Sequence, residues 1–297
     1  MTDKESESIS ELGIIIPAYN EEEGIAAILE DLDDEPMLRD AEILVIDDGS
    51  TDRTCDIVRQ FSRARLIKHR INEGYGASII TGIRAVDKPY VVWCDADGQH
   101  RADDVSRVAH KLINEDLDYC IGVRDKDSHQ TTDRKLGRYA LNLAVKITSG
   151  RSVEDFNSGL RGFKRDVIKK YLHLLPKRFG ASTTTTLIML ERGYSGSEVP
   201  IHAGKRLGKS TVNPVRDGAR TLLLILRIFL LFKPLLFFGS IGFGMIILGS
   251  VYGIARALIS RQGIPVLAAL IIIFGIQSLF FGLLADQISA LRREKFE

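Results

Sequence analysis

Two long uncharged stretches near the C-terminus constrain this chain more than any other feature of its sequence. Residues 234–255 form 22 consecutive uncharged positions, and residues 262–285 form another 24. A helix rises about 1.5 Å per residue, so either stretch is long enough to cross a hydrocarbon core of roughly 30 Å. The alternative, a pair of buried core helices, is disfavoured because uncharged runs of this length are unusual in a soluble protein. We therefore predict two transmembrane helices, at residues 234–256 and 262–285.

Basic residues around these stretches predict which side of the membrane each chain end faces. Arg256 and Arg261 border the short connecting loop, whereas the outer flanks carry Arg216, Arg220, Arg227, Lys233, Arg292, Arg293 and Lys295. Because Lys and Arg are enriched in cytoplasmic segments, we expect a two-span protein of the cell membrane with both termini, including the tail at 286–297, in the cytoplasm. Residues 219–233 are largely apolar, and we expect them to lie along the interface as an amphipathic juxtamembrane helix. The two spans also offer a surface for homo-oligomer formation.

The rest of the chain, residues 11–218, has the charge density of an ordinary globular domain. It follows a polar tail at residues 1–10 that lacks the apolar segment of a cleaved signal peptide. The net charge is +1, and so balanced a chain does not favour a nucleic-acid binder, which needs a clustered basic surface. Cys55, Cys94 and Cys120 are odd in number and show no C-x-x-C spacing, so we expect them to be reduced core residues.

Short β-branched runs alternate with amphipathic stretches in the first part of this domain. The runs at 12–17, 43–47, 65–69 and 90–94 predict strands, and the stretches at 22–32, 52–61, 77–86 and 103–114 predict helices. Ser50 or Thr51 is expected to N-cap the second helix. This alternation predicts an α/β fold with a mostly parallel, doubly wound sheet, whose ligand site lies beyond the carboxyl ends of the strands. After about residue 120 the alternation weakens, and we expect a second functional half.

The motif D-A-D-G-Q-H, residues 95–100, carries the sharpest chemical signal. It directly follows the apolar run Y-V-V-W-C, so Asp95 and Asp97 are expected at the end of a buried strand. Two carboxylates two residues apart can share one Mg²⁺ or Mn²⁺, and these ions also take phosphate oxygens. An isolated D-x-D motif is otherwise a solvated acidic turn. The agreement of the neighbouring motifs favours the metal site.

Polar motifs also follow the first two predicted strands. In I-I-I-P-A-Y-N-E-E, residues 17–21 form a turn that can present backbone amides and the Tyr19 ring to a nucleotide; alternatively, Pro17 only terminates the strand. In V-I-D-D-G-S-T-D, Asp47 or Asp48 can accept a hydrogen bond from a base or ribose. The alternative is that these carboxylates merely cap the next helix.

The motif I-N-E-G-Y-G-A opens the third predicted helix. Its glycines, including Gly76, let a ligand approach the backbone closely. The spacing is not the G-x-G-x-x-G fingerprint of dinucleotide-binding domains, because the next glycine after Gly76 is Gly82. A Rossmann dehydrogenase is therefore disfavoured.

Taken in order, I-I-P-A-Y-N-E-E, V-I-D-D-G-S-T-D, N-x-G-x-G-x-A and D-A-D-G-Q-H resemble glycosyltransferase family 2. Downstream, G-V-R, R-K-L, S-G-L-R-G-F-K-R and V-P-I-x(5)-R-x-G-K-S resemble the dolichol-phosphate mannose synthase branch of that family. The resemblance covers roughly residues 12–215. It implies that residues 11–218 form a GT-A domain, a nucleotide-binding α/β domain.

The resemblance also implies roles for individual residues. Nucleotide contacts are implied for Pro17, Tyr19, Glu21, Asp48, Gly76 and Asp95, and a metal motif for Asp95, Asp97 and Gln99. Cations that hold the acceptor and donor phosphates are implied at Arg124, Arg134 and Arg206, with Lys135, Lys209 and Ser210 as neighbouring candidates. Asp97, Arg124 and Arg134 are the implied catalytic residues. The cations also have a simpler interpretation, since Arg124, Arg134 and Arg161 can be surface partners of Asp125, Asp133 and Asp155.

Two departures from the family pattern bear on the mechanism. Arg138 stands where relatives often carry a serine near the acceptor phosphate, which affects the expected acceptor geometry. The predicted helix after Gly180 has S-T-T-T-T where some relatives place an acidic residue, so a carboxylate base from that helix is not expected. A phosphate acceptor needs no such base, because the second pKa of a phosphomonoester lies near 6.

The sequence therefore predicts inverting, metal-dependent transfer of a hexose to a polyprenyl phosphate of the dolichyl type at the cytoplasmic membrane face. GDP-mannose and UDP-glucose are the expected donors, and Mg²⁺ or Mn²⁺ the expected cofactor. One alternative is transfer to a hydroxyl of a glycan or lipid, which would require a general base. The other is a non-catalytic membrane scaffold, which the two carboxylates of the metal motif argue against.

Overall fold

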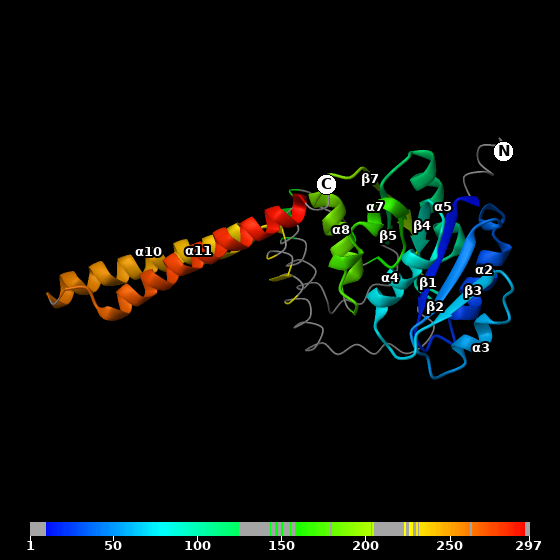
Figure 1. Cartoon of the computed structure of the whole chain (residues 1–297), viewed down its shortest axis with the longest axis horizontal. Coiled ribbons are helices and arrows are strands. Elements are labelled where there is room, and N and C mark those ends of the chain that lie inside the picture. Colours follow the sequence, from blue (N-terminus) through cyan, green and yellow to red (C-terminus); the bar gives the residue numbers. More distant parts are fainter. Residues whose placement is uncertain are drawn as a thin grey trace. The chain divides into compact units, whose positions relative to one another are not determined.

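The computed structural model describes residues 10–124, 158–178, 180–202, 232–261 and 263–294, together with single residues at 143, 146, 147, 150, 155, 204, 223, 226, 227 and 230. The chain forms two compact units (Figure 1). The first, which we term the sheet unit, comprises Met1–Asn142 and Arg151–Asp217, and the second, the hairpin unit, comprises Leu143–Gly150 and Gly218–Glu297.

A mixed, mostly parallel sheet forms the centre of the sheet unit. Its strands are β1 (Leu12–Ala18), β2 (Glu42–Asp47), β3 (Ala64–Lys68), β4 (Tyr90–Trp93), β5 (Tyr119–Arg124), β6 (Arg161–Lys164) and β7 (Gly196–Ile201), in the order β3-β2-β1-β4-β6-β5-β7. All neighbours are parallel except β6, which runs antiparallel to both β4 and β5. The four strands predicted from the sequence and the mostly parallel sheet are confirmed.

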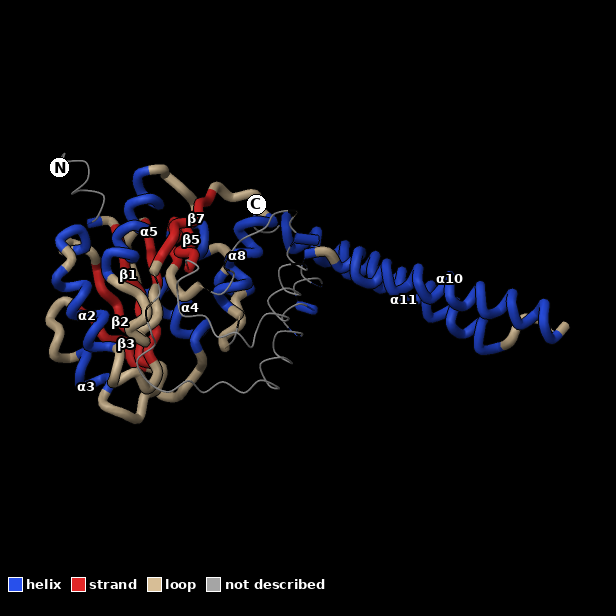
Figure 2. The backbone as a smooth tube through the Cα atoms, turned by 180° about the vertical axis from the view of Figure 1, so that it is seen from behind, coloured by secondary structure: helices blue, strands red, loops and turns tan. Residues whose placement is uncertain are grey.

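Helices cover both faces of this sheet. They are α2 (Ile25–Asp34), α3 (Thr54–Val58), α4 (Tyr75–Ala85), α5 (Ala102–Asn114), α7 (Arg165–Lys169) and α8 (Ala181–Glu191), with short 3-10 helices at Pro36–Leu38 and Leu172–Leu174. Helices α2, α3 and α5 lie on one side of the sheet, and α4 and α8 on the other (Figure 2). Helix α7 packs against α4. The four predicted helices are confirmed, with starts and ends that differ by a few residues.

Strand β1 is buried along its whole length, as expected for a central strand covered on both faces. Leu12, Ile14 and Ile16 point into the core that α2 and α5 close, whereas Ile15 packs under Gly82 of α4. Each fully buried aliphatic side chain contributes about 1.5–3 kcal/mol. On β4, the ring of Trp93 stacks on Phe163 of β6, with centroids 4.8 Å apart. The three cysteines are buried free thiols, which confirms the expected reduced core residues.

The predicted N-cap at Ser50 or Thr51 is wrong. Helix α3 begins at Thr54 with Arg53 in the N-cap position, and no side chain caps it there. The Ser50 hydroxyl instead accepts a hydrogen bond from the backbone N–H of Asn20, at 2.9 Å. The Ser50 hydroxyl, which local sequence rules assign to the N-terminus of the helix, therefore joins two loops instead.

The hairpin unit contains two long helices, α10 (Pro234–Ser260) and α11 (Val266–Glu294), which lie side by side in Figure 1. Small residues let their backbones approach: a Cβ on Gly242 would lie 2.6 Å from the carbonyl oxygen of Gly275, and one on Gly275 would lie 2.7 Å from that of Gly242. On α11 the buried positions recur every seven residues, at Ala268, Gly275, Gly282 and Ser289, as in helices packed along a seam.

Both helices are long and apolar enough to cross a membrane. The qualifying segments are Pro234–Ile259 and Val266–Leu291, with mean hydropathy 1.9 and 2.5, and most of their surface is exposed. They correspond to the two predicted spans, and α11 continues to Glu294, beyond the predicted end of the second span. The predicted interfacial helix at 219–233 lies mostly outside the described residues.

Candidate active site

The carboxyl ends of β1, β2 and β4 meet at one edge of the sheet, because these strands are parallel and adjacent. Parallel sheets bind ligands at this edge. Pro17 is buried as the last residue but one of β1, so the turn predicted at residues 17–21 begins after Ala18, and Tyr19 just beyond the strand is 45% exposed. Asp48 follows β2, and Asp95 and Asp97 follow β4. The structure thus brings these predicted residues to one edge.

The loops after β1 and β2 are joined by a set of backbone and side-chain hydrogen bonds. Asn20, whose φ of 53° is left-handed, accepts from the backbone N–H of Thr51 through Oδ1 at 2.9 Å. The N–H of Glu21 donates to the Thr54 hydroxyl at 3.0 Å, and the N–H of Glu22 donates to Asp52 at 3.1 Å. The predicted nucleotide residue Glu21 therefore belongs to a loop held in place by its neighbour loop.

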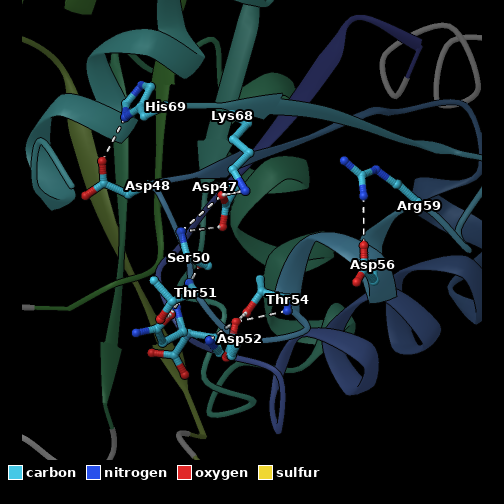
Figure 3. Close-up of polar contacts among 12 residues, drawn as sticks. Asp47, Asp48, Ser50, Thr51, Asp52, Thr54, Asp56, Arg59, Lys68 and His69 are labelled. Carbon is cyan, nitrogen blue, oxygen red and sulfur yellow. Dashed lines mark hydrogen bonds and ion pairs between the residues drawn. The ribbon is translucent and has the colours of Figure 1, made fainter. Parts of the chain in front are cut away.

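The acidic pair at the end of β2, Asp47 and Asp48, is occupied with neighbouring groups of the chain (Figure 3). Asp47 accepts from the N–H of Ser50 at 3.2–3.3 Å and lies 3.8 Å from the Lys68 ammonium. Asp48 is 3% exposed, and it contacts Nδ1 of His69 at 2.8 Å. It also accepts from two backbone N–H groups in the loop before α4, those of Glu73 at 2.9 Å and Gly74 at 2.7 Å. Asp48 thus holds the loop that leads into α4; its predicted nucleotide contact stays a prediction.

Gly76 lets the backbone at the start of α4 pack closely against the backbone of Pro176. A Cβ at this position would overlap the carbonyl oxygen of Pro176, and the N–H of Ala77 donates to the carbonyl of Lys177 at 2.8 Å. The first turn of α4 is therefore pinned to the segment before α8. A backbone does approach Gly76 closely, as expected, but in this structure it is that of Pro176. The predicted contact of Gly76 with a nucleotide stays a prediction.

Asp95 and Asp97 lie against three other segments. The phenol hydroxyl of Tyr75 donates to Oδ1 of Asp95 at 2.8 Å, and Gly159 packs so close to Asp95 that a Cβ would overlap its Oδ2. Gly24, just before α2, packs against the backbone of the motif, where a Cβ would lie 2.6 Å from the carbonyl oxygen of Ala96. Asp97 is 5% exposed, and its Oδ1 accepts from the N–H of Gln99 at 3.1 Å. Glycines at 24 and 159 thus bring the loops to the acidic pair.

Gln99 links this motif to the segment that follows β7. Its side-chain Nε2 donates to the carbonyl of Gly204 at 3.1 Å, and the N–H of Gly204 donates back to the carbonyl of Gln99 at 2.9 Å. The next residue, His100, is buried, and burial lowers the pKa of its imidazole although the charge of Asp97 opposes this. In this structure the Gln99 amide nitrogen positions a neighbouring loop.

Arg124, at the end of β5, forms a two-pronged ion pair with Asp155. Its Nε and Nη2 donate to the Asp155 carboxylate at 2.6 and 3.0 Å. This hydrogen bonding raises the pKa of the guanidinium, and the charges of Asp95 and Asp97 act in the same direction. The surface interpretation paired Arg124 with Asp125 and Arg161 with Asp155. In the structure, Asp155 pairs with Arg124.

The surface interpretation of Arg161 is wrong. Its side chain is fully buried between β6 and α8, and it donates to the carbonyls of Ser158 at 2.8 Å and Ser182 at 2.7 Å, and to the Thr186 hydroxyl. Burial lowers the pKa of this guanidinium to about 10. Arg161 connects the segment next to Gly159 with the first turn of α8.

The other predicted phosphate-binding residues, Arg134, Lys135, Arg206, Lys209 and Ser210, lie outside the described residues, as does Arg138. Sequence reasoning missed Tyr75, Gly24 and the buried position of Arg161. Tyr75 stands between the two glycines of N-E-G-Y-G, and an aromatic residue at such a strand-to-helix turn is the signal that could have found it.

The residues at the end of β4 fit a hard divalent cation. Within the described part of the chain no three His, Cys, Asp or Glu side chains gather into a complete metal cluster. Two carboxylates suffice, however, because Mg²⁺ and Mn²⁺ complete their coordination with water and with the phosphates of a substrate. The carboxylate oxygens of Asp95 and Asp97 are also the hard ligands that such an ion prefers.

The sequence and the fold are both similar to those of known sugar-transferring enzymes. Residues 13–172, more than half of the chain, match the family described as Glycosyl transferase family 2, and residues 233–291 match the GtrB C-terminal hairpin. Glycosyltransferase AglJ of Haloferax volcanii is 31% identical over 297 residues, which cover 96% of this chain and 95% of that protein. The dolichyl-phosphate hexose transferase of the same organism is 30% identical over 216 residues, covering 71% of this chain and 91% of that protein.

Among solved structures, the fold is similar to that of glucosyl-3-phosphoglycerate synthase from Mycobacterium tuberculosis. A complex of that enzyme with Mn²⁺, uridine diphosphate and glucosyl-3-phosphoglycerate superposes with a TM-score of 0.61 and 18% identity, covering 77% of this chain and 83% of that chain. The predicted GT-A fold is thereby confirmed. With the family match over more than half of the sequence, the chain is a glycosyltransferase and belongs to glycosyl transferase family 2.

Proposed function

We propose that this enzyme transfers a hexose, mannose or glucose, from a nucleotide sugar to a polyprenyl phosphate at the cytoplasmic face of a membrane, with inversion at the anomeric carbon. The acidic pair at the end of β4, on a chain that also carries a hairpin of two membrane-length apolar helices, is the observation that carries this proposal. A similar protein named for dolichyl-phosphate hexose transfer supports the lipid acceptor. GDP-mannose and UDP-glucose are the proposed donors.

Asp95, Asp97 and Gln99 would hold the Mg²⁺ or Mn²⁺ ion, which when bound neutralises charge on the departing nucleotide diphosphate. The nucleotide itself would lie over the turn after β1, where the Tyr19 ring is exposed beyond Pro17. The backbone N–H groups of Asn20 and Glu21 are already engaged with the loop after β2, so this part of the turn is held in place before the nucleotide arrives. A fixed site loses little conformational entropy on binding.

The acceptor side needs positive charge more than it needs a base. A phosphomonoester has a second pKa near 6, so a lipid phosphate is largely a dianion at neutral pH and attacks without being deprotonated. At its N-terminal end α8 offers threonines at 183–186, all buried, and its one carboxylate, Glu191, is the last residue of the helix. Arg124 has five N–H donors, of which Asp155 engages two in the part of the chain that the structure describes. Arg124, with Arg134 and Arg206, would hold the attacking phosphate by charge-assisted hydrogen bonds.

The test is a transfer assay with the full chain in membranes. Purified protein is incubated with labelled GDP-mannose or UDP-glucose, Mg²⁺ or Mn²⁺, and dolichyl phosphate, and a labelled lipid is extracted and identified. Asp97→Ala should abolish the product. Asp103→Asn is the matched control, because Asp103 is a solvent-exposed carboxylate on the first turn of α5, six residues from Asp97 in the sequence.

The outcomes separate the proposed reaction from its alternatives. A labelled lipid that forms only with polyprenyl phosphate, and disappears in Asp97→Ala but not in Asp103→Asn, supports the proposal. Label transferred to an alcohol or a glycan, with none on the lipid phosphate, would show that the acceptor is a hydroxyl group. Full turnover by Asp97→Ala would contradict the proposed metal role of the acidic pair.

A further inference from the structure

Tyr75 contacts Asp95 of the acidic pair directly, and the proposed reaction does not involve it as a ligand or a catalyst. It is the first residue of α4, and its hydroxyl donates to Oδ1 of Asp95 at 2.8 Å. An ionised carboxylate can only accept hydrogen bonds, and a phenol is protonated at neutral pH. The direction of this hydrogen bond is therefore fixed by chemistry.

The position of the Tyr75 side chain is itself determined by three elements. The carbonyls of Lys177 and Arg178 accept from the backbone N–H groups of Ala77 and Gly76, which fixes the first turn of α4. The Ser182 hydroxyl on α8 hydrogen-bonds the phenol oxygen. The carbonyl of Ser182 accepts in turn from the buried Arg161 of β6, at 2.7 Å. A rotation of the Tyr75 ring would therefore disturb α4 and α8 together.

The second carboxylate oxygen of Asp95, which does not contact Tyr75, is also confined. Its Oδ2 lies so close to Gly159 that no Cβ fits there, and Gly159 is adjacent to Ser158, whose carbonyl accepts from Arg161 at 2.8 Å. Arg161 thus supports both neighbours of Asp95, the phenol through Ser182 and the glycine through Ser158. One oxygen of Asp95 bears the phenol hydrogen bond, and the other lies against a backbone position without a side chain.

We propose that Tyr75 is a positioning residue that orients Asp95 for binding the divalent cation. This rests on the proposed function only in that Asp95 contributes to a metal site. A carboxylate that can rotate about two side-chain bonds must lose that freedom when it coordinates a metal. Tyr75 removes the freedom beforehand, so the metal binds to a carboxylate already in its final orientation. Hydrogen-bonding partners of metal ligands typically change metal affinity by about 10- to 100-fold.

The variant Tyr75→Phe tests this, because it keeps the ring and its packing and removes only the hydroxyl. Mn²⁺ binding to the full-length protein is measured by electron paramagnetic resonance, with and without UDP or GDP. Binding of Mn²⁺ by Tyr75→Phe should be weaker than in the unmodified protein by about 10-fold or more. Sugar transfer at saturating Mn²⁺ should recover most of its rate, while the Mn²⁺ concentration for half-maximal rate rises by the same factor.

Tyr171→Phe provides the matched control. Tyr171 is a buried tyrosine of the sheet unit, and its hydroxyl bonds to that of Tyr194 at 3.0 Å rather than to an acidic residue. Loss of a partly buried hydroxyl contact should lower the melting temperature in both variants, but only Tyr75→Phe should weaken Mn²⁺ binding. A merely structural role for Tyr75 would give the two variants the same Mn²⁺ affinity.

Two results would overturn the inference. One is Mn²⁺ affinity in Tyr75→Phe equal to that of the unmodified protein, and the other is a lack of specific Mn²⁺ binding by the unmodified protein in the presence of either nucleotide. Failure of the proposed acceptor has a different signature. An unmodified protein that binds Mn²⁺ more tightly than Tyr75→Phe, yet forms no lipid-linked sugar, would support the role of Tyr75 and refute the polyprenyl phosphate.

Discussion

The two acidic pairs at the carboxyl edge of the sheet look alike in the sequence and differ in the fold. Both stand at the end of a strand and precede a glycine, in D-D-G at the end of β2 and D-A-D-G after β4. Asp48 is committed to the backbone N–H groups of Glu73 and Gly74 and to His69. Asp95 accepts a side-chain hydrogen bond from Tyr75 and lies against Gly159, where close packing leaves room for no side chain.

The difference separates Asp48, which holds a loop through its backbone N–H groups, from Asp95, which we propose as a metal ligand. Loss of an acceptor for buried backbone N–H groups destabilises the fold, since each unsatisfied donor costs about 1–3 kcal/mol. Loss of the Asp95 charge should weaken the proposed metal site, while an amide at this position can still accept the Tyr75 hydrogen bond. Substitutions in the two pairs should therefore separate activity from stability.

The largest expected effect is on turnover, in Asp95→Asn. The amide keeps the size of the side chain and can still accept the Tyr75 hydrogen bond, but it lacks the negative charge that binds a metal. We expect kcat/KM for sugar transfer to fall by about 100-fold or more, because a bound metal contributes several kcal/mol to stabilising the transition state. The melting temperature without metal should change by only a few degrees or less. A large drop in that temperature would place Asp95 with the structural pair.

The next effect is on stability, in Asp48→Ala. The N–H groups of Glu73 and Gly74 and the His69 ring all lose their acceptor in a buried position. We expect unfolding to become easier by about 3 kcal/mol, measured by thermal or chemical denaturation of the protein in detergent. Asp56→Ala is the control, because Asp56 is an exposed partner of Arg59 on the neighbouring helix (Figure 3) and should change stability by about 0.5 kcal/mol or less. Equal effects of the two substitutions would remove the distinction between the pairs.

A smaller effect is expected in Gly24→Ala, which tests the packing of the loop on the metal motif. The new Cβ would lie 2.6 Å from the carbonyl oxygen of Ala96 and 3.0 Å from the Cα of Asp97. Backbone atoms cannot move aside as a flexible side chain can, and overpacking of this kind costs about 1–3 kcal/mol. We expect the apparent Mn²⁺ requirement for transfer to rise along with the loss of stability. Destabilisation without any change in that requirement would show that the loop does not position the motif.

The smallest effect concerns pH and the buried His100. Burial lowers the pKa of this imidazole in the folded protein, so below about pH 6.5 the unfolded chain binds a proton there more readily than the folded protein does. Stability contributed by the neutral ring is present above that pH and decreases as the pH falls towards the lowered pKa, by at most about 1.4 kcal/mol per pH unit. Melting temperatures between pH 7.5 and 5.5 should therefore fall more steeply for the unmodified protein than for His100→Gln. If the melting temperatures of the two proteins fell equally with pH, protonation of His100 would not be what lowers the stability.

The strands that carry the acidic pairs were predictable because they are uninterrupted apolar runs between turn residues. Strand β6 was not, since it begins with Arg161 and ends with Lys164, and Arg161 is buried only because backbone carbonyls and a threonine satisfy its guanidinium. The insertion of β6 between β4 and β5 depends on pairing between distant segments, and no local pattern encodes it. The two spans were the simplest prediction, because length and the absence of charge suffice.

Within the site, the residue types were predictable and their partners were not. The motif order brought Asp95 and Asp97 to the correct edge, but D-D-G and D-A-D-G carry no local signal that separates a loop-holding carboxylate from a ligand. That assignment depends on where the loops at residues 70–74 and 158–159 lie, which tertiary packing decides. The same limit explains Ser50, which follows the sequence rule for an N-cap and bonds instead to the loop after β1.

The Trp93 ring, which stacks on Phe163, also gives the protein an intrinsic fluorescent probe. Trp93 is the only tryptophan of the 297 residues, it is fully buried, and it stands two positions before Asp95. Fluorescence excited in the indole band therefore originates at a single place, on the strand that leads into the acidic pair. Quenching of this emission by paramagnetic Mn²⁺ would follow occupancy of the edge without any label, and a red shift would mark water reaching the centre of the sheet.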